Sequence, residues 1–232
     1  MKNGQSVDAS ELVALFPLPN CVLLPRAVIP LHIFEPRYRE MTADCLKGTP
    51  QLAMALLIPG YEPRYYSNVA AIYPIVCVGQ IVRHEMLDDG RYNILLQGVV
   101  RAEVVAEDRT RSYRRARVAV RPTTGVAGDE SSEAIRRQLA ALLSEPPIST
   151  FAGECNWRQL VESKDLPVSD VVDYLANAVS CDVECARRFL EETDLARRSR
   201  MLFAEIKDFA RRLELAGDSG CSRPWPRRLV TN

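Results

Sequence analysis

The chain has 232 residues, and its 30 basic and 30 acidic residues cancel. A neutral chain carries no overall field that would draw it to nucleic acid or to an anionic membrane. The polar start MKNGQSVDAS lacks the apolar core of a secretion signal, and no apolar run approaches the ~20 residues of a membrane span. Seven cysteines, an odd number without a C-x-x-C pair, are typical of neutral thiols rather than a disulfide framework. We therefore expect a cytoplasmic protein with no membrane partner.

The first half of the chain carries short apolar runs separated by turn residues, a pattern typical of strands in a mixed sheet or barrel. The runs are LVALF (12–16), VLLP (22–25), QLAMALLI (51–58), IVCVGQIVR (75–83), RYNILLQ (91–97), VVRAEVV (99–105) and YRRARVAV (113–120). The Asp89-Gly90 dipeptide predicts a hairpin whose tight turn has positive φ at both residues. Gly98 lies between two runs and predicts a bulge or a sharp bend.

One early helix is predicted where PLHIFEPRYREM (30–41) leaves its strand-like start. Pro36 suits the first helical position, and Gly48 with Pro50 ends the helix. The apolar face recurs at helical spacing: Tyr38, Met41 and Cys45. Glu35 is predicted to cap the helix by accepting backbone N–H groups, worth about 0.5–2 kcal/mol. With Arg37 and Arg39 it also suits a polar clamp between the sheet and the helix.

The segment PGYEPRYYSNVAAIYP (59–74) is a long connection between two predicted strands. Long loops that carry aromatic residues and arginine are common recognition sites. The candidate ligand-binding residues are Tyr61, Arg64, Tyr65 and Tyr66. The alternative is that some of these tyrosines, or Tyr73, fold back over the core.

Six arginines in RTRSYRRARVAVR (109–121) form a second candidate for binding. A strand from residue 114 would turn Arg115, Arg117 and Arg121 to one face, as a nucleic-acid groove would require. The other face would carry apolar side chains: Ala116, Val118 and Val120. We favour the alternative, an edge strand whose arginines pair with nearby acidic residues, because the whole chain is neutral.

From about residue 122 the pattern becomes helical. The run EAIRRQLAALL (133–143) predicts an amphipathic helix, and residues 145–167 are expected to be irregular. Three further helices are predicted to begin at capping residues: Ser169, Asp182 and Asp194. We expect a β-rich domain over 1–122, a helical bundle over 123–216 and a flexible tail over 217–232, an α+β arrangement.

Motifs of catalysis are absent from the sequence. It has no G-x-x-x-x-G-K-[ST] loop, no G-x-G-x-x-G and no G-x-S-x-G. Its two histidines, His32 and His84, are far apart, and a metal site from His84, Cys77 and a carboxylate is disfavoured. We therefore expect no cofactor, no metal and no enzyme activity.

The stretch FPLPNCVLLPRAVIPLHIFEPRYREM (16–41) resembles the opening of the Lon protease N-terminal substrate-binding domain family. VGQIVRHEMLDDGRYNILLQGVVRAEV (78–104), DYLANAV (173–179) and RRFLEETDLARR (187–198) are similar to its later elements. The motif at the start of the early helix comprises Phe34, Glu35, Pro36, Arg37 and Tyr38.

This resemblance implies a PUA-like distorted β-barrel with one early helix, followed by a C-terminal helical bundle. It also implies a non-catalytic recognition module that binds unfolded polypeptide or a protein partner, without the ATPase and peptidase parts of Lon. The alternative is a PUA-like module that binds RNA through residues 109–121, although nucleic acid is the less expected partner.

Overall fold

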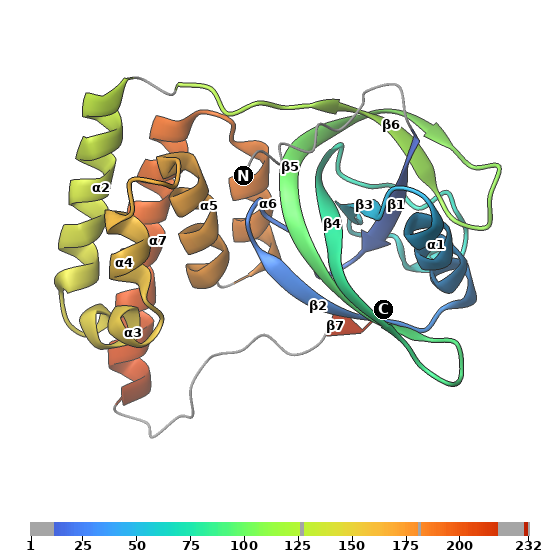
Figure 1. Cartoon of the computed structure of the whole chain (residues 1–232), viewed down its shortest axis with the longest axis horizontal. Helices are drawn as coiled ribbons and strands as arrows, with labels where there is room; N and C mark the ends of the chain where they lie inside the picture. The colour runs from blue at the N-terminus through green and yellow to red at the C-terminus, as the bar shows by residue number, and fades with distance from the viewer. Residues whose placement is uncertain (1–11, 126–127, 181, 218–229, 232) are drawn as a thin grey trace. The chain divides into compact units, whose positions relative to one another are not determined.

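The computed structural model describes residues 12–125, 128–180, 182–217 and 230–231 (Figure 1). The chain divides into two compact units, Met1–Pro122 with Arg228–Asn232, and Thr123–Arg227. Of the predicted flexible tail, residues 218–229 and 232 lie outside the described residues.

The strands of the first unit form a seven-stranded sheet in the order β4-β3-β1-β6-β5-β2-β7. Their bounds are β1 Leu12–Leu18, β2 Val28–Ile33, β3 Gln51–Leu56, β4 Ile75–Met86, β5 Tyr92–Asp108, β6 Arg115–Val120 and β7 Val230–Thr231. Because β4 also pairs with β5, strands β4, β3, β1, β6 and β5 close into a ring, and Figure 1 shows β4 and β5 curving around its interior. With the helices of the second unit, this confirms the α+β class and the barrel-like sheet.

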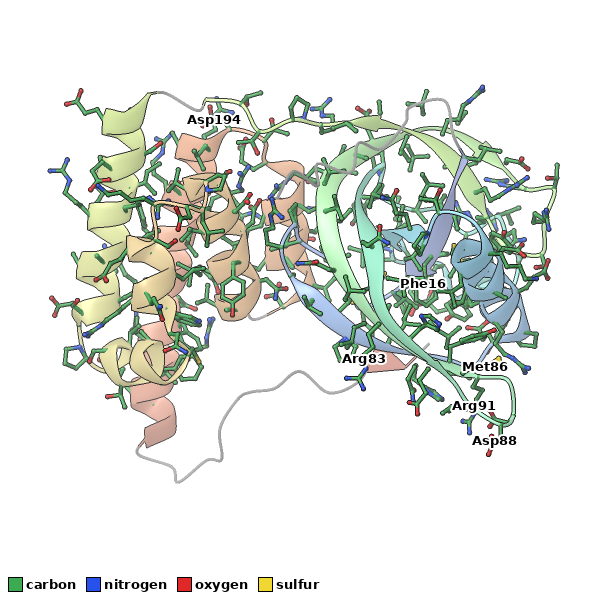
Figure 2. The ribbon with its side chains drawn as sticks, viewed as in Figure 1. Phe16, Arg83, Met86, Asp88, Arg91 and Asp194 are labelled. Atoms are coloured by element: carbon green, nitrogen blue, oxygen red, sulfur yellow. The ribbon has the colours of Figure 1, made fainter. Side chains whose placement is uncertain are left out.

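Alanine, valine and leucine side chains fill the barrel from alternate positions, because successive side chains of a strand point to opposite faces. The buried cluster takes every second residue from five strands: Val13, Leu15, Ala53, Ala55, Val76, Val78, Ala102, Ala116 and Val118. The other face of β1 is also buried, and it carries Phe16, which is labelled in Figure 2. The Phe16 ring meets Tyr38 of α1 (Pro36–Lys47) edge-on, with ring centres 4.7 Å apart. Both faces of β1 are therefore covered.

The run at 22–25 was predicted to be a strand, and this is wrong. Leu23 and Leu24 are fully buried, but the chain turns directly after them. Arg26 has a φ of 67°, and Ala27 N–H donates to the Leu24 carbonyl at 3.1 Å. Strand β2 therefore begins only at Val28.

The two predicted runs at 91–97 and 99–105 form one long strand, β5, with a bulge between them. The pairing with β4 shifts register between Val78 and Gly79, opposite Gly98. A Cβ on Gly98 would lie 2.1 Å from the Leu24 carbonyl oxygen, so only glycine fits there. The bulge predicted at Gly98 is confirmed.

The hairpin between β4 and β5 is also confirmed, but its turn type differs from the prediction. Gly90 has a φ of 79°, whereas Asp89 is not among the residues with positive φ. Gly90 N–H donates to the Leu87 carbonyl at 2.8 Å, and Leu87 N–H donates to the Arg91 carbonyl at 2.8 Å. This is the longer loop in which one left-handed residue follows an ordinary turn. The Asp89 carboxylate stabilises it by accepting from Arg91 N–H at 3.0 Å.

The second unit contains six helices within the described residues. Their bounds are α2 Asp129–Ser144, α3 Ile148–Glu154, α4 Trp157–Glu162, α5 Val168–Val179, α6 Val183–Glu191 and α7 Leu195–Gly217. The Asp182 and Asp194 carboxylates accept backbone N–H groups at 2.7 and 2.8 Å, so both predicted caps are confirmed. The cap predicted at Ser169 is wrong, because α5 begins at Val168 and Ser169 lies inside the helix.

Residues 145–167 were predicted to be irregular, but they contain α3 and α4. An aromatic cluster holds these short helices to α7: Phe151 and Phe209 meet at 5.3 Å, and Phe151 and Trp157 at 5.2 Å. Tertiary packing thus stabilises helices too short to form on their own.

A buried ion pair lies between α5 and α7. The Arg198 Nε lies 2.9 Å from the Asp173 carboxylate, and both side chains are almost fully excluded from solvent. Arg198 also donates to the carbonyl of Glu192 at 2.9 Å and to the hydroxyl of Thr123 at 3.3 Å. The pair therefore fixes α7 against both α5 and the start of the unit.

Candidate functional site

The tyrosine segment, residues 59–74, is held against the start of α1. Tyr65 O–H donates to the Glu35 carboxylate at 3.1 Å, and the Tyr65 carbonyl accepts from the Arg37 guanidinium at 3.2 Å. The guanidinium also lies 5.4 Å from the centre of the Tyr65 ring. Two stretches that are distant in the sequence therefore meet at Tyr65.

Glu35 is the residue that joins them. Its carboxylate forms an ion pair with Arg37 at 2.9 Å, and both side chains are nearly buried. Glu35 occupies the position before α1, but its side chain caps no backbone N–H, so the predicted cap is wrong. The carboxylate is instead engaged by Arg37 and Tyr65, which are stronger partners because one is charged.

The third member of the expected clamp lies elsewhere. A Cβ on Gly90 would lie 2.2 Å from an Arg39 guanidinium nitrogen, which places Arg39 against the β4–β5 turn. Arg37 instead lies over the Tyr38 ring, 4.4 Å from its centre. Tyr38 is buried, and this burial raises the pKa of its hydroxyl.

Three of the predicted ligand-binding residues form a ring cluster. Tyr65 lies 5.9 Å from Tyr61 and meets Tyr66 edge-on at 5.0 Å. The Tyr66 side chain is 84% exposed, the largest exposure among the exposed apolar and aromatic residues described. Arg64 is exposed beside them, and its carbonyl accepts from the Ser67 hydroxyl at 2.7 Å. Burial and the Glu35 carboxylate raise the pKa of Tyr65 to about 12, so its hydroxyl stays a neutral donor.

The far end of the tyrosine segment is anchored on the loop before β6. Asn68 donates to the Ser112 carbonyl at 2.9 Å, and Arg114 donates to the Ala70 carbonyl at 2.7 Å. Arg114 is buried and forms an ion pair with Glu107 at 2.7 Å. The segment is thus held at Tyr65 and again at Asn68 and Ala70, and the exposed Tyr66 lies between these anchors.

Five of the six arginines of 109–121 form ion pairs with acidic residues of β5 or α1. Besides Arg114–Glu107, the ion pairs are Arg109–Glu107 at 3.4 Å, Arg111–Asp44 at 3.3 Å, Arg115–Asp108 at 2.8 Å and Arg121–Glu103 at 3.1 Å. Burial by itself would raise the pKa of the Glu107 carboxyl group. Hydrogen bonds from Arg114 and Arg109 outweigh this effect, so the pKa is lowered. On β6, Ala116 and Val118 point inward as predicted, whereas Val120 is 39% exposed.

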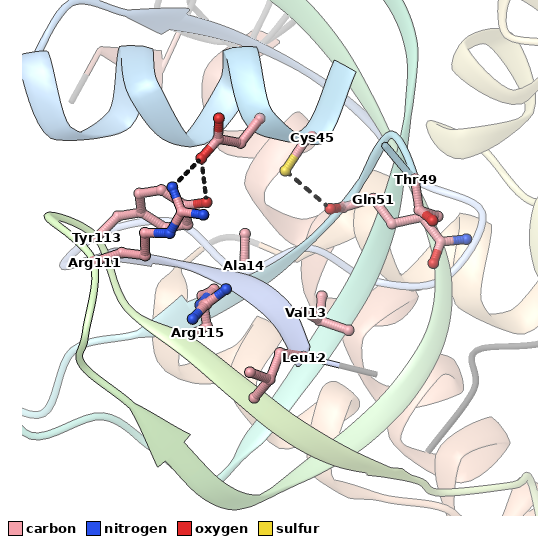
Figure 3. Close-up of a pocket in the computed structure, with 10 residues that line it drawn as sticks. Leu12, Val13, Ala14, Cys45, Thr49, Gln51, Arg111, Tyr113 and Arg115 are labelled. Atoms are coloured by element: carbon pink, nitrogen blue, oxygen red, sulfur yellow. Dashed lines mark hydrogen bonds and ion pairs between the residues drawn. The ribbon is translucent and has the colours of Figure 1, made fainter. Parts of the chain in front are cut away.

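A pocket of about 370 Å³ opens between the end of α1 and the first residues of β1, β3 and β6 (Figure 3). Its wall carries the Asp44 carboxylate, which accepts from Tyr113 O–H at 2.9 Å and from Arg111. Cys45 donates its S–H to the Gln51 carbonyl at 3.3 Å, and burial and Asp44 raise the thiol pKa to about 12. The thiol is therefore no nucleophile at neutral pH. No sequence pattern indicated this pocket, because its walls come from four separate segments.

The structure brings together no metal-binding group within the described residues. Cys77 is buried in β4, whereas His84 lies exposed on the same strand. His32 Nδ1 lies 2.8 Å from the Asn93 side-chain oxygen. Among the described residues, no helix is both long enough and apolar enough to cross a bilayer.

Comparison with known proteins agrees with the fold. Residues 13–208 match the ATP-dependent protease La (LON) substrate-binding domain. The Lon protease of Anaeromyxobacter dehalogenans is 23% identical over 200 residues, which cover 84% of this chain and 23% of that protein. Lon protease 2 of Myxococcus xanthus is 24% identical over 202 residues, with the same two coverages. The chain thus spans about a quarter of the length of these relatives.

Two solved structures share the fold. The Lon N-terminal domain protein from Xanthomonas campestris has a TM-score of 0.59 at 22% identity, covering 84% of this chain and 98% of that one. The N-terminal domain of Mycobacterium avium complex Lon protease has a TM-score of 0.63 at 17% identity, with coverages of 85% and 99%. Since the family match extends over most of its length, the chain belongs to the LON substrate-binding domain family.

Proposed function

We propose that this chain is a non-catalytic recognition module that binds unfolded or extended polypeptide, or a segment of a partner protein, in the cytoplasm. The observation that carries this proposal is the ring cluster of Tyr61, Tyr65 and Tyr66, in which Tyr66 is exposed, Tyr61 and Tyr65 are half-buried, and Tyr65 is held by Glu35 and Arg37. Membership of the substrate-binding family supports the same role.

The physical argument rests on pre-organisation. Tyrosine offers a large amphipathic contact area at low conformational-entropy cost. Because Tyr65 is held through both its hydroxyl and its carbonyl, less freedom is lost when a ligand orders the neighbouring rings. An unfolded polypeptide exposes apolar side chains that such rings cover without demanding one sequence.

The proposal includes no bond-breaking step and no cofactor. Proteolysis is an activity of the full-length relatives, of which this chain spans about a quarter. The one thiol on the pocket wall is held protonated, as its raised pKa shows. Casein cleavage by the pure chain, abolished by a single substitution in it, would contradict this part of the proposal.

The test is binding of the full chain to an array of peptides from an unfolded protein. Tyr61→Ala/Tyr66→Ala should weaken binding at least tenfold, since the rings of both residues contribute contact area to the ligand. Tyr174→Ala is the matched control, because Tyr174 is 40% exposed on α5, outside the cluster, and it should bind as the parent does. Equal binding by the double variant and the parent would remove the tyrosine cluster as the site.

RNA binding through residues 109–121 is the second candidate, favoured by the half-exposed guanidiniums of Arg109, Arg111 and Arg121. Their acidic partners weigh against it. The candidate requires an affinity that falls steeply with salt and weakens in Arg115→Ala/Arg117→Ala. We expect no retention of RNA on the chain at low salt.

A further inference from the structure

The last described residues of the chain form a strand on the edge of the sheet. Strand β7 runs parallel to β2, with Val230 beside Leu31 and Thr231 beside His32. The opposite edge of β2 is paired with β5 along its whole length, from Val28 to Ile33. In Figure 1, β7 lies alongside β2 as a short addition to the sheet.

Strand β7 covers only part of this edge. Its register reaches Leu31 and His32, while within the described residues Val28–Pro30 and Ile33 have no strand partner on that side. An edge with unpaired backbone groups is a template for another extended chain. Pro30 is compatible with an edge strand but lacks an N–H, so an added segment could pair there only with its carbonyl.

Apolar residues are exposed at both ends of β2. Val28 at the start of β2 is 48% exposed, and Phe34 just after its end is 40% exposed. The distance between them corresponds to a strand of about six residues, roughly 20 Å. An extended segment on this edge could form main-chain hydrogen bonds along β2 and place apolar side chains against both ends.

We propose that the outer edge of β2 is a strand-addition site for extended polypeptide, and that Val230–Thr231 occupy it as an internal ligand which an incoming segment displaces. The site accepts a parallel segment with β-branched residues, as Val230 and Thr231 are, because such residues favour strands. Main-chain hydrogen bonds supply the affinity in this mode of recognition, so the site is tolerant of sequence. This inference rests on the proposed function and names a second contact surface for it.

Because β7 already occupies part of the edge, a free peptide must compete with it for binding. A tethered segment acts at an effective concentration of about 1 mM when its linker is short and flexible. If the internal sequence binds the vacated edge with a Kd of about 10 μM, a free peptide would bind the occupied edge about 100-fold less well than the vacated edge. Removing the internal strand is therefore expected to expose the site.

The experiment uses the labelled peptide PRRLVTN, residues 226–232, and fluorescence anisotropy with three full-length proteins. Val230→Pro/Thr231→Pro should bind the peptide at least tenfold more tightly than the parent chain, since proline cannot maintain the pairing. Ser219→Pro, which introduces the same residue type before β7, should behave as the parent. The peptide with proline at both strand positions, PRRLPPN, should not bind any of them.

Two outcomes would overturn the inference. One is equal peptide affinity in the double variant and the parent, with circular dichroism showing both folded. The other is equal binding of PRRLVTN and PRRLPPN to the double variant. Peptide-array binding by the same parent chain separates these failures from failure of the proposed function, because array binding through the tyrosines does not need the β2 edge.

Discussion

Replacing Glu35 should weaken the attachment of the tyrosine segment to α1. Glu35→Ala removes the partner of Arg37 and the acceptor of Tyr65 in one step. Breaking an exposed pair costs about 0–1 kcal/mol, and breaking a buried one costs about 3–5 kcal/mol. Since the two side chains are 11% and 13% exposed, we expect a loss of about 2–3 kcal/mol in the free energy of unfolding.

A double-mutant cycle isolates the part of this loss that belongs to the tyrosine segment. Tyr65→Phe removes only the hydroxyl that donates to Glu35, so it should cost about 0.5–1.5 kcal/mol alone. In the Glu35→Ala background the same change should cost about zero, because its acceptor is gone. Urea unfolding measures all four proteins, and Tyr66→Phe, on the exposed ring, is the control expected within about 0.5 kcal/mol of the parent. Additive losses in the double variant would refute the proposed anchoring.

Three further predictions concern the fold. Gly98→Ala should destabilise by about 1–3 kcal/mol or more, because its Cβ would meet a backbone carbonyl, whereas Gly153→Ala, with open space in a helix, should stabilise by about 0.5–1 kcal/mol in the same urea assay. Asp173→Ala should cost about 3–5 kcal/mol by leaving the Arg198 charge buried, and a thermal midpoint equal to that of the parent would argue against the pair. Folding raises the pKa of Tyr65 from 10.0 to about 12, so the folded state retains the proton more firmly. This contribution is present below pH 10 and is lost as the pH rises toward 12; Tyr65→Phe should make the fall in unfolding free energy over that window shallower, and an unchanged slope would contradict this cause.

Local sequence patterns predicted the elements that depend on local chemistry. Pro36 and the spacing of Tyr38, Met41 and Cys45 located α1, and its bounds agree with them. Gly98 marked the bulge because a close backbone approach leaves one residue type that fits. Asp182 and Asp194 marked helix starts because a short carboxylate reaches a backbone N–H only from that position.

The errors arose where distant residues decide the outcome. Glu35 has the position of a cap, but Tyr65, 30 residues later, and Arg37 take its carboxylate. The stretch 145–167 lacks a helical period, yet Phe209 packs against its aromatic residues. Leu23 and Leu24 are apolar like a strand, but their burial comes from a turn packed under Gly98.

The candidate site shows the same division. The sequence indicated Tyr61, Tyr65 and Tyr66 as one loop, and it indicated residues 35–37 as a separate hinge. Only the structure joins them, through a hydroxyl on one and a carboxylate on the other. The pocket of Figure 3 could not be anticipated, since no single segment supplies more than a part of its wall.

Strand β5 is central to the unfolding of the barrel. It pairs with β4, β6 and β2, so three of the other strands depend on one continuous backbone. Such an element cannot open locally without releasing its neighbours. The slowest-exchanging amides should therefore lie on β5, and their exchange should report the global unfolding of this unit.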